Sequence, residues 1–155
     1  MIETARNVAL LAPVPRVYLD DGRLVAEREG RVAFGSRAWQ VFRELDDLRA
    51  GLPVDVYIYA SHDDAALVAS WVARYVAHVE SSGGAHPAGM RYRPPSTATH
   101  VSDNDGWWAV FWEVEDLRML PRNDHIPVSH FTGFGKRKAY GKPFVPEGPI
   151  LIEHP

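Results

Sequence analysis

The sequence predicts an α+β domain in which a small, curved and mostly antiparallel β-barrel carries two main helices packed on it. The first observation is the length of 155 residues, which matches one domain with its own hydrophobic core. The second is a series of short apolar or alternating runs bounded by glycine and proline, which are typical of strands. The third is that strand and helix patterns do not alternate regularly, which argues against a doubly wound parallel sheet.

The N-terminal part of the chain predicts three or more short strands. Residues 8–12 form an apolar run that ends at Pro13, which indicates a buried strand. Residues 17–19 and 24–26 flank Asp20-Asp21-Gly22, and an Asp-Gly pair suits the turn of a hairpin because glycine accepts a positive φ. Residues 31–34 predict a further strand, which ends at Gly35.

A helix and the clearest strand of the sequence follow. Ser36 can cap a helix over residues 37–49, where apolar side chains recur at three-residue spacing along one face. Residues 54–60 alternate between apolar and polar side chains, as a half-buried strand does. The polar face of this strand carries Asp55, Tyr57, Tyr59 and Ser61.

The middle of the chain predicts a second helix over residues 63–80, where Leu67, Trp71 and Tyr75 recur every four residues among valines. Residues 85–106 contain several prolines and small polar residues, which indicate a long loop. We interpret this helix and loop as an insertion at about 62–106 in a single domain spanning residues 1–155. Residues 107–115 predict an aromatic-rich strand, and residues 149–153 predict the last one.

Composition narrows the classes of protein. The chain has no cysteine, which excludes a disulfide framework, a cysteine-ligated zinc and a thiol nucleophile. It shows neither a secretory signal nor an apolar run of about 18 residues, so we expect a cytoplasmic protein without a membrane partner.

Charge is unevenly distributed along the chain. The formal net charge is −3, which argues against a basic coat over the whole surface. Between positions 118 and 143, however, basic residues dominate, with Asp124 as the single acid: Arg118, Arg122, Lys136, Arg137, Lys138 and Lys142. This segment is either one positive face of an acidic body or an ordinary solvated loop.

Catalytic motifs are weak in this sequence. It contains no phosphate loop, no dinucleotide fingerprint and no nucleophile elbow, and we expect no cofactor. His100, Asp103 and Asp105 are of the residue types that bind divalent metals, but their spacing is explained more simply by a turn, so we expect no metal. His125 and His130 each have an adjacent polar residue, and adjacent residues of an extended chain point to opposite faces.

Aromatic residues form the most informative group. Trp107, Trp108 and Trp112 fall on one predicted strand, so that Trp108 and Trp112 share one face of the sheet and Trp107 lies on the other. A tryptophan on the face away from the core can stack on a flat base, and basic residues nearby can hold its phosphate. The alternative is that these aromatics fill the barrel core.

Four segments resemble the PUA-like superfamily, which includes the ASCH, EVE and YTH domains. They are the apolar strand at residues 8–12, the alternating strand at 54–61, the long strand at 108–117 and the proline-punctuated closing segment from Ile126 through Pro143 to Ile150. The GxKxxExR pattern of ASCH domains is not found, so no family site residue is carried over.

The resemblance implies binding of RNA or DNA, with a single, sometimes modified, base held in an aromatic pocket. Position and chemistry nominate five residues of this chain for ligand binding, namely Trp39, Tyr59, Ser61, Trp107 and Phe131. Three residues of the basic segment, Lys136, Arg137 and Lys138, are nominated for contacts with the nucleic-acid backbone.

Two other classes of function remain open from the sequence. One is a small hydrolase or nuclease on the same barrel, which would use His100, His130 or Asp103 together with Lys136. The other is a protein-interaction module, which an exposed apolar patch would favour.

Overall fold

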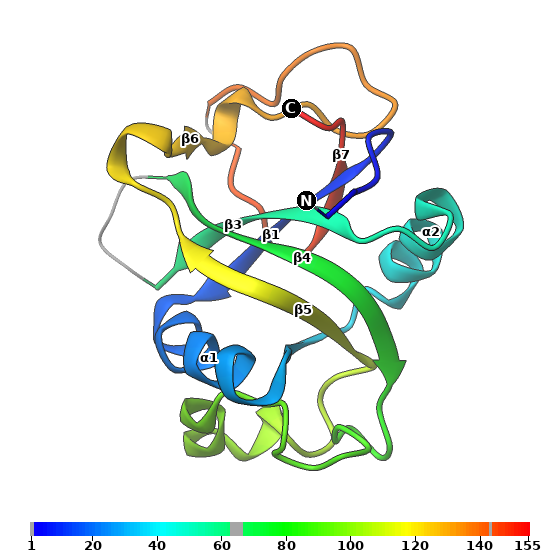
Figure 1. The fold of residues 1–155 in the computed structure, drawn as a ribbon, viewed down its shortest axis with the longest axis vertical. Coiled ribbons are helices and arrows are strands. Elements are labelled where there is room, and N and C mark those ends of the chain that lie inside the picture. Colours follow the sequence, from blue (N-terminus) through cyan, green and yellow to red (C-terminus); the bar gives the residue numbers. More distant parts are fainter. Residues whose placement is uncertain (1, 63–66, 143) are drawn as a thin grey trace.

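A computed structural model describes residues 2–62, 67–142 and 144–155 of the chain (Figure 1). Its two α-helices are α1 (Arg16–Glu29) and α2 (Trp39–Arg49). Its strands are β1 (Ala9–Pro15), β2 (Val32–Ser36), β3 (Val54–Ser61), β4 (Val68–Glu80), β5 (Val110–Met119), β6 (Ile126–Pro127) and β7 (Ile150–Ile152). Short 3₁₀ turns lie at Pro95–Thr99, Val101–Asp103, Arg122–Asp124 and Val128–His130.

The strands form one sheet in the order β2-β5-β4-β3-β1-β7, and β6 pairs with the beginning of β4. Every pairing is antiparallel except that of β1 with β3. The sheet curls into a half-barrel, and α1 and α2 lie at its two sides (Figure 1). The prediction of an α+β fold with two helices and a curved, mostly antiparallel sheet is therefore confirmed.

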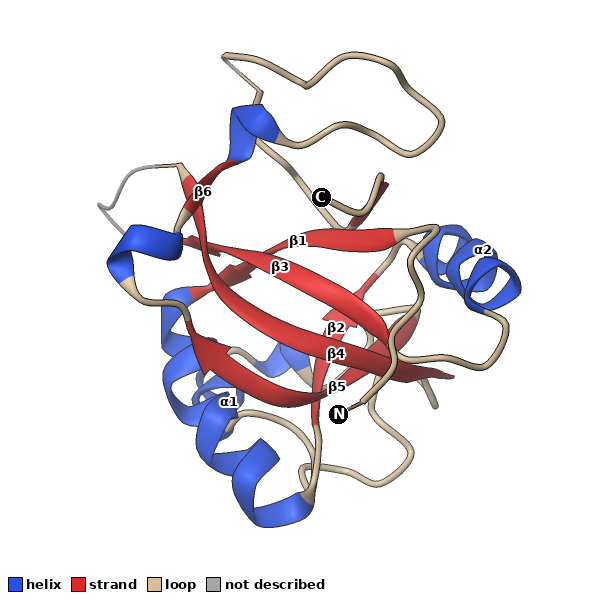
Figure 2. Cartoon of the chain, turned by 45° about the horizontal axis from the view of Figure 1, so that its top comes forward, coloured by secondary structure: helices blue, strands red, loops and turns tan. Residues whose placement is uncertain are grey.

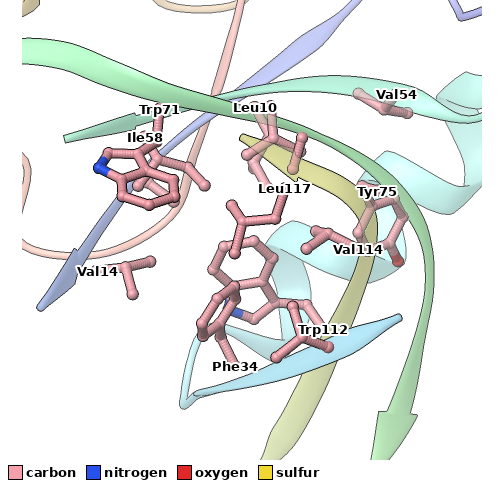
Figure 3. Packing of buried hydrophobic residues seen from close by; sticks show 14 of the residues in the cluster. Leu10, Val14, Phe34, Val54, Ile58, Trp71, Tyr75, Trp112, Val114 and Leu117 are labelled. Carbon is pink, nitrogen blue, oxygen red and sulfur yellow. The ribbon is translucent and has the colours of Figure 1, made fainter. Parts of the chain in front are cut away.

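The main core fills the space inside the curled sheet. Leu10, Ile58, Trp71, Val114 and Leu117 converge there from β1, β3, β4 and β5 (Figure 3). Helix α2 contributes Phe42, whose ring stacks on Tyr75 and on Trp112 at centroid distances of 5.7 and 5.8 Å. Burial of these large side chains removes much apolar surface from water and supplies most of the fold's stability.

The outer face of the sheet carries a second, smaller core. Alternation along β1 and β3 places Ala9, Leu11, Tyr57 and Tyr59 on this face, opposite the main core. Residues of the C-terminal segment cover part of it, namely Val128, Phe131, Tyr140, Phe144 and Ile152. Among the described residues, this C-terminal cover does not extend over the rest of the outer face, where Ile2, Thr4 and Arg6 border β3, β4 and β5.

Five predicted elements are confirmed with small shifts at their ends. The strands predicted at 8–12, 31–34, 54–60 and 149–153 correspond to β1, β2, β3 and β7, and the helix predicted at 37–49 corresponds to α2. The strand predicted at 107–115 begins later, at Val110, and Trp107 and Trp108 precede it. Both faces of β5 are buried from Val110 to Val114, so its alternation does not separate core from surface.

The predicted hairpin at residues 17–26 is wrong, because this segment is helix α1. Gly22 does not make a turn: it is buried within the helix, where a Cβ would lie 3.4 Å from Pro94 and 3.5 Å from Val32. A glycine at this point lets the helix approach β2 and the loop after β4 closely. The chain therefore does begin with an alternation of strand and helix, and the parallel pairing of β1 with β3 follows from it.

The predicted helix at residues 63–80 is also wrong over its described part, because residues 68–80 form strand β4, the central strand between β3 and β5. Residues 63–66 lie outside the described residues. In β4 the buried side chains are Ala69, Trp71, Ala73 and Tyr75, which is a period of two. Because valines also stand at intervening positions, the sequence fits a helical period as well as a period of two. The β-branched valines favour the strand.

No helix in the described part of the chain is long and apolar enough to span a membrane. The loop predicted at 85–106 is present as residues 81–109 without a named strand, and it packs beneath α1 (Figure 2).

Candidate functional site

The five residues predicted to bind a ligand fall into two groups in the structure. Trp39 and Trp107 lie near the beginnings of α2 and β5, and both indoles are exposed, by 42% and 51%. Tyr59 and Phe131 belong instead to the second core on the outer face of the sheet. Ser61 ends β3, on the same face as Tyr59. The structure therefore does not gather these residues into one pocket.

Arginine side chains lie on both exposed tryptophans. The guanidinium of Arg37 is 4.8 Å from the ring centroid of Trp107, and that of Arg43 is 5.1 Å from the ring centroid of Trp39. These cation–π contacts stabilise the indoles at the surface but leave them partly covered. Phe131, only 3% exposed, packs at 5.4 Å against the Tyr57 ring, so its ring is not free to stack on a base.

The three residues predicted for the nucleic-acid backbone stand together on a surface loop. Lys136, Arg137 and Lys138 are exposed, and none of them makes an ion pair with the part of the chain that the structure describes. The loop is closed by a bridge between Thr132 and Ala139. We call residues 132–139 the basic loop.

A groove lies on the uncovered part of the outer face, with a volume of about 370 Å³. Its basic side chains come from three distant parts of the sequence: Arg6 from the N-terminal segment, Arg74 from β4 and Arg118 from β5. Tyr57 of β3 lines the groove beside them, half-buried. We call this surface the arginine groove.

A local irregularity of the sheet brings Arg74 and Arg118 together. The register between β4 and β5 shifts between Val72 and Arg74, and Asp116 adopts a φ of 52°. A positive φ is unfavourable for a residue with a side chain, and such strain often marks functional positions. Asp116 accepts hydrogen bonds from Arg74 at 2.8 Å and from Arg118 at 3.3 Å, which fixes both guanidinium groups over the groove.

Contacts at the C-terminus connect the groove to the basic loop. Asp55 lines the groove, and its carboxylate lies 2.7 Å from Nε2 of His154 and accepts a hydrogen bond from Thr4. The neighbouring residue Glu153 accepts a hydrogen bond from the backbone N–H of Gly135 in the basic loop. The arginine groove and the basic loop thus adjoin the same short stretch of chain.

The residues proposed for a hydrolase are not assembled. Asp103 lines a cavity beside Trp108, His130 lines a different hollow beside Phe144, and His100 is exposed. Within residues 2–62, 67–142 and 144–155, no three histidine, aspartate or glutamate side chains converge as metal ligands would. These positions give no common acid–base centre.

Two histidines, the half-buried His78 and the buried His86, make contacts that the sequence did not predict. Nδ1 of His78 lies 2.9 Å from Asp46, which also accepts hydrogen bonds from Tyr75 and Arg49. Desolvation by burial, together with the neighbouring Asp46, raises the pKa of Tyr75, so its hydroxyl stays protonated. The partners of His78 hold its ring in place, as a structural network does.

The second histidine, His86, belongs to a buried ion-paired network. It accepts a hydrogen bond from the N–H of Ala88 at Nδ1, so its Nε2 carries the proton and donates to Glu113 at 3.0 Å. Arg31 also donates to Glu113, at 3.1 Å. Burial by itself raises the pKa of Glu113, but the hydrogen bonds from His86 and Arg31 outweigh it and leave that pKa below its ordinary value.

A scan against protein-family models, a search of curated proteins and a search of solved structures each found no match to this chain. The structure therefore defines the protein by its architecture, which is an α+β half-barrel with an arginine-rich groove on its outer face.

Proposed function

We propose that the protein binds single-stranded nucleic acid, with the phosphate backbone following the arginine groove and the basic loop. The observation that supports this most directly is the set of exposed cations at positions 136–138, which form no ion pair with residues 2–62, 67–142 and 144–155 and adjoin a groove lined by three arginines. Unpaired cations attract phosphates most strongly, since a cation that is already paired must give up its partner.

The charges in the groove favour an anionic ligand. Arg6 is exposed and makes no ion pair within the described residues, and the Arg118 side chain is 58% exposed beside Asp116. The fixed guanidinium groups present planar forks, which suit phosphate oxygens. With a net charge of −3 over the whole chain, attraction of a polyanion has to be local to this face.

The floor of the groove favours a single strand over a duplex. Tyr57 presents a half-buried ring beside the arginines, and bases of a single strand stack on such rings irrespective of sequence. The bases of a duplex are already stacked on one another and are not available to it. The resemblance to PUA-like domains, and with it recognition of a modified base, stays a prediction.

The test is a titration of a fluorescently labelled 12-nucleotide single strand by anisotropy at several salt concentrations. We expect the affinity to fall with salt because phosphate contacts release counterions. The double variant R6A/R118A removes two contacts and should reduce the slope of log affinity against log salt by about 1.4, since each contact with a single strand contributes about 0.7.

The matched control is R28A/R43A, which removes the same charge from exposed arginines on α1 and α2, away from the groove. Arg43 lies on Trp39, so this control also tests the region of the two exposed tryptophans. A loss of binding in R28A/R43A with none in R6A/R118A would place the ligand there and overturn the proposal. Undetectable binding by the wild-type protein at low salt would favour a protein-interaction module.

A further inference from the structure

A small cavity of about 190 Å³ lies on the other side of the molecule from the basic loop, where the end of β1, the first turn of α1 and the loop before β5 meet. Its walls are largely apolar and aromatic, and Phe34 and Trp108 supply two of them. Its polar side chains are Tyr18, Arg93 and Asp103. An aromatic cavity with a few converging polar groups is the usual form of a small-molecule site.

Asp103 is the central polar group of this cavity. Its Oδ2 accepts a hydrogen bond from the hydroxyl of Tyr18 at 2.7 Å, and its Oδ1 accepts one from the indole N–H of Trp108 at 3.1 Å. Each carboxylate oxygen has a second lone pair, and the Tyr18 oxygen also retains acceptor capacity. The polar side of the cavity is therefore rich in acceptors, and it calls for a ligand with N–H donors.

Arg93 balances the charge of Asp103. Its guanidinium is 2% exposed, donates to the carbonyl oxygens of Ala33 and Asp103, and lies 3.6 Å from Oδ1 of Asp103. Burial lowers the pKa of Arg93 to about 10, which leaves it charged at neutral pH. Because this cation offsets the carboxylate, the cavity favours an uncharged ligand over a cationic one.

The indole of Trp108 lies directly against the backbone of Gly35. A Cβ at Gly35 would overlap the Trp108 indole, so glycine is required for the indole to lie where it does. The hydrogen bond from its Nε1 to Asp103 fixes the same, nitrogen-bearing edge of the indole. This wall of the cavity is thus pre-organised, which lowers the entropy lost on binding a flat ligand.

We infer that this cavity binds one uncharged, planar six-membered ring that carries N–H donors, with the size and chemistry of a pyrimidine base. The volume supports one ring, since an apolar cavity of about 150 Å³ holds benzene. The ring lies against Trp108, and its N–H groups donate to Asp103 and Tyr18. The inference does not depend on the arginine groove, because its residues are separate.

The test is isothermal titration calorimetry of the wild-type protein with cytosine, uracil, adenine and benzyl alcohol. We expect saturable binding of a pyrimidine, weaker binding of the larger purine, and weaker binding still of benzyl alcohol, which has no N–H donor. A protein that binds all four compounds equally, or no pyrimidine at millimolar concentration, contradicts the inference.

Variants locate the binding. Asp103→Asn should lower pyrimidine affinity at least tenfold, because a donor replaces an acceptor that pairs with the ligand. Tyr18→Phe removes one acceptor and tests the same contact if Asp103→Asn does not fold. The matched control is Tyr140→Phe, which removes a tyrosine hydroxyl from the second core on the outer face and should leave affinity unchanged. Equal affinity in Tyr18→Phe, Asp103→Asn and Tyr140→Phe would overturn the site.

Two further measurements show whether the bound ring comes from a free small molecule or from a nucleic-acid strand, and whether the cavity and the arginine groove act independently. A pyrimidine nucleoside and a short pyrimidine oligonucleotide compete with the free base if the cavity accepts a ring attached to sugar or to a strand. Competition by the free base and nucleoside alone assigns the cavity to a free small molecule. The R6A/R118A variant should bind the free base like the wild-type protein, so failure of the groove does not count against the cavity.

Discussion

Two long segments without extended strands lie at opposite ends of the molecule: residues 81–109 beneath α1, and the described part of 131–149 (131–142 and 144–149) above β1 (Figure 1). Both are rich in glycine and proline, and both read as loops in the sequence. They differ in where their charged side chains point. The difference separates the segment that builds a cavity from the segment that presents a charged surface.

The segment at 81–109 buries two of its basic side chains. Arg93 is buried and binds two backbone carbonyl groups, and His86 is buried against Glu113. The ends of this segment are closed by a hydrogen bond from Gly106 to Gly83. A buried charge is tolerated only with partners, so each of these contacts orders the loop.

The segment at 131–149 turns its aromatic rings inward and its charges outward. The rings of Tyr140 and Phe144 stack at a centroid distance of 4.0 Å, and Phe131 packs on Tyr57. Lys136, Arg137 and Lys138 remain exposed. Apolar anchors hold this loop on the sheet without using its cations, which stay available for a partner.

The largest effect is expected from Arg93→Ala, which removes the counter-charge of Asp103 and a hydrogen-bond donor to two backbone carbonyl groups. We expect the free energy of unfolding to fall by about 4 kcal/mol, the cost of breaking a buried charge network. Urea unfolding measures it, with Arg91→Ala as the control, because the Arg91 side chain is 61% exposed and pairs only at the surface. Similar losses for both variants would show that the buried position adds nothing.

A somewhat smaller effect is expected from Phe131→Ala, which removes the apolar anchor of the basic loop. The free energy of unfolding should fall by about 3 kcal/mol, from lost burial and the cavity left behind. Val145→Ala, at an exposed position of the same segment, should change it by less than about 0.5 kcal/mol. If Phe131→Ala were equally mild, aromatic packing would not hold this segment in place.

The ion pair of Glu113 predicts that the free energy of unfolding depends on pH, with an effect of intermediate size. Its pKa in the folded protein lies below the ordinary value of 4.5, so its stabilising contribution is present above that pH and is lost as pH falls through the folded value. Glu113→Gln should therefore lower the free energy of unfolding by about 2 kcal/mol near neutral pH. The difference from the wild-type protein should shrink in acid, and a difference that grew in acid would contradict this.

The smallest effect on stability is expected from the triple variant K136A/R137A/K138A, because these side chains form no ion pair with any residue that the structure describes. The free energy of unfolding should change by less than about 0.5 kcal/mol, whereas the salt slope of single-strand binding should fall by about 2. Anisotropy and urea unfolding on the same preparation check both. A large loss of stability with an unchanged salt slope would mean that the basic loop is structural.

The sequence predicted those parts of the fold in which a single pattern was decisive. Strand β3 was recognisable because one set of alternating positions is apolar and the other is polar. Strand β4 was not, because Val68, Val72 and Val76 stand at intervening positions four residues apart and fit a helix equally well. Helix α1 was missed because Gly22 looks like a turn residue, whereas its function is close packing against Pro94.

The candidate site was predictable only where its residues are adjacent in the chain. Lys136, Arg137 and Lys138 form a run that composition reveals. The arginine groove brings Arg74 to Asp116 across 42 positions, through a register shift and a positive φ that no local pattern announces. The contact between Tyr18 and Asp103 spans 85 positions and depends equally on the finished fold.

The most direct test of the central claim is to map the surface that a single-stranded oligonucleotide contacts, by ¹H–¹⁵N chemical-shift perturbation. The account predicts the largest shifts around Arg6, Tyr57, Arg74 and Arg118 and in the basic loop, with small shifts near Trp39 and Trp107. Shifts confined to the region of Trp39 and Trp107 would contradict it and would place the nucleic acid on the tryptophans instead.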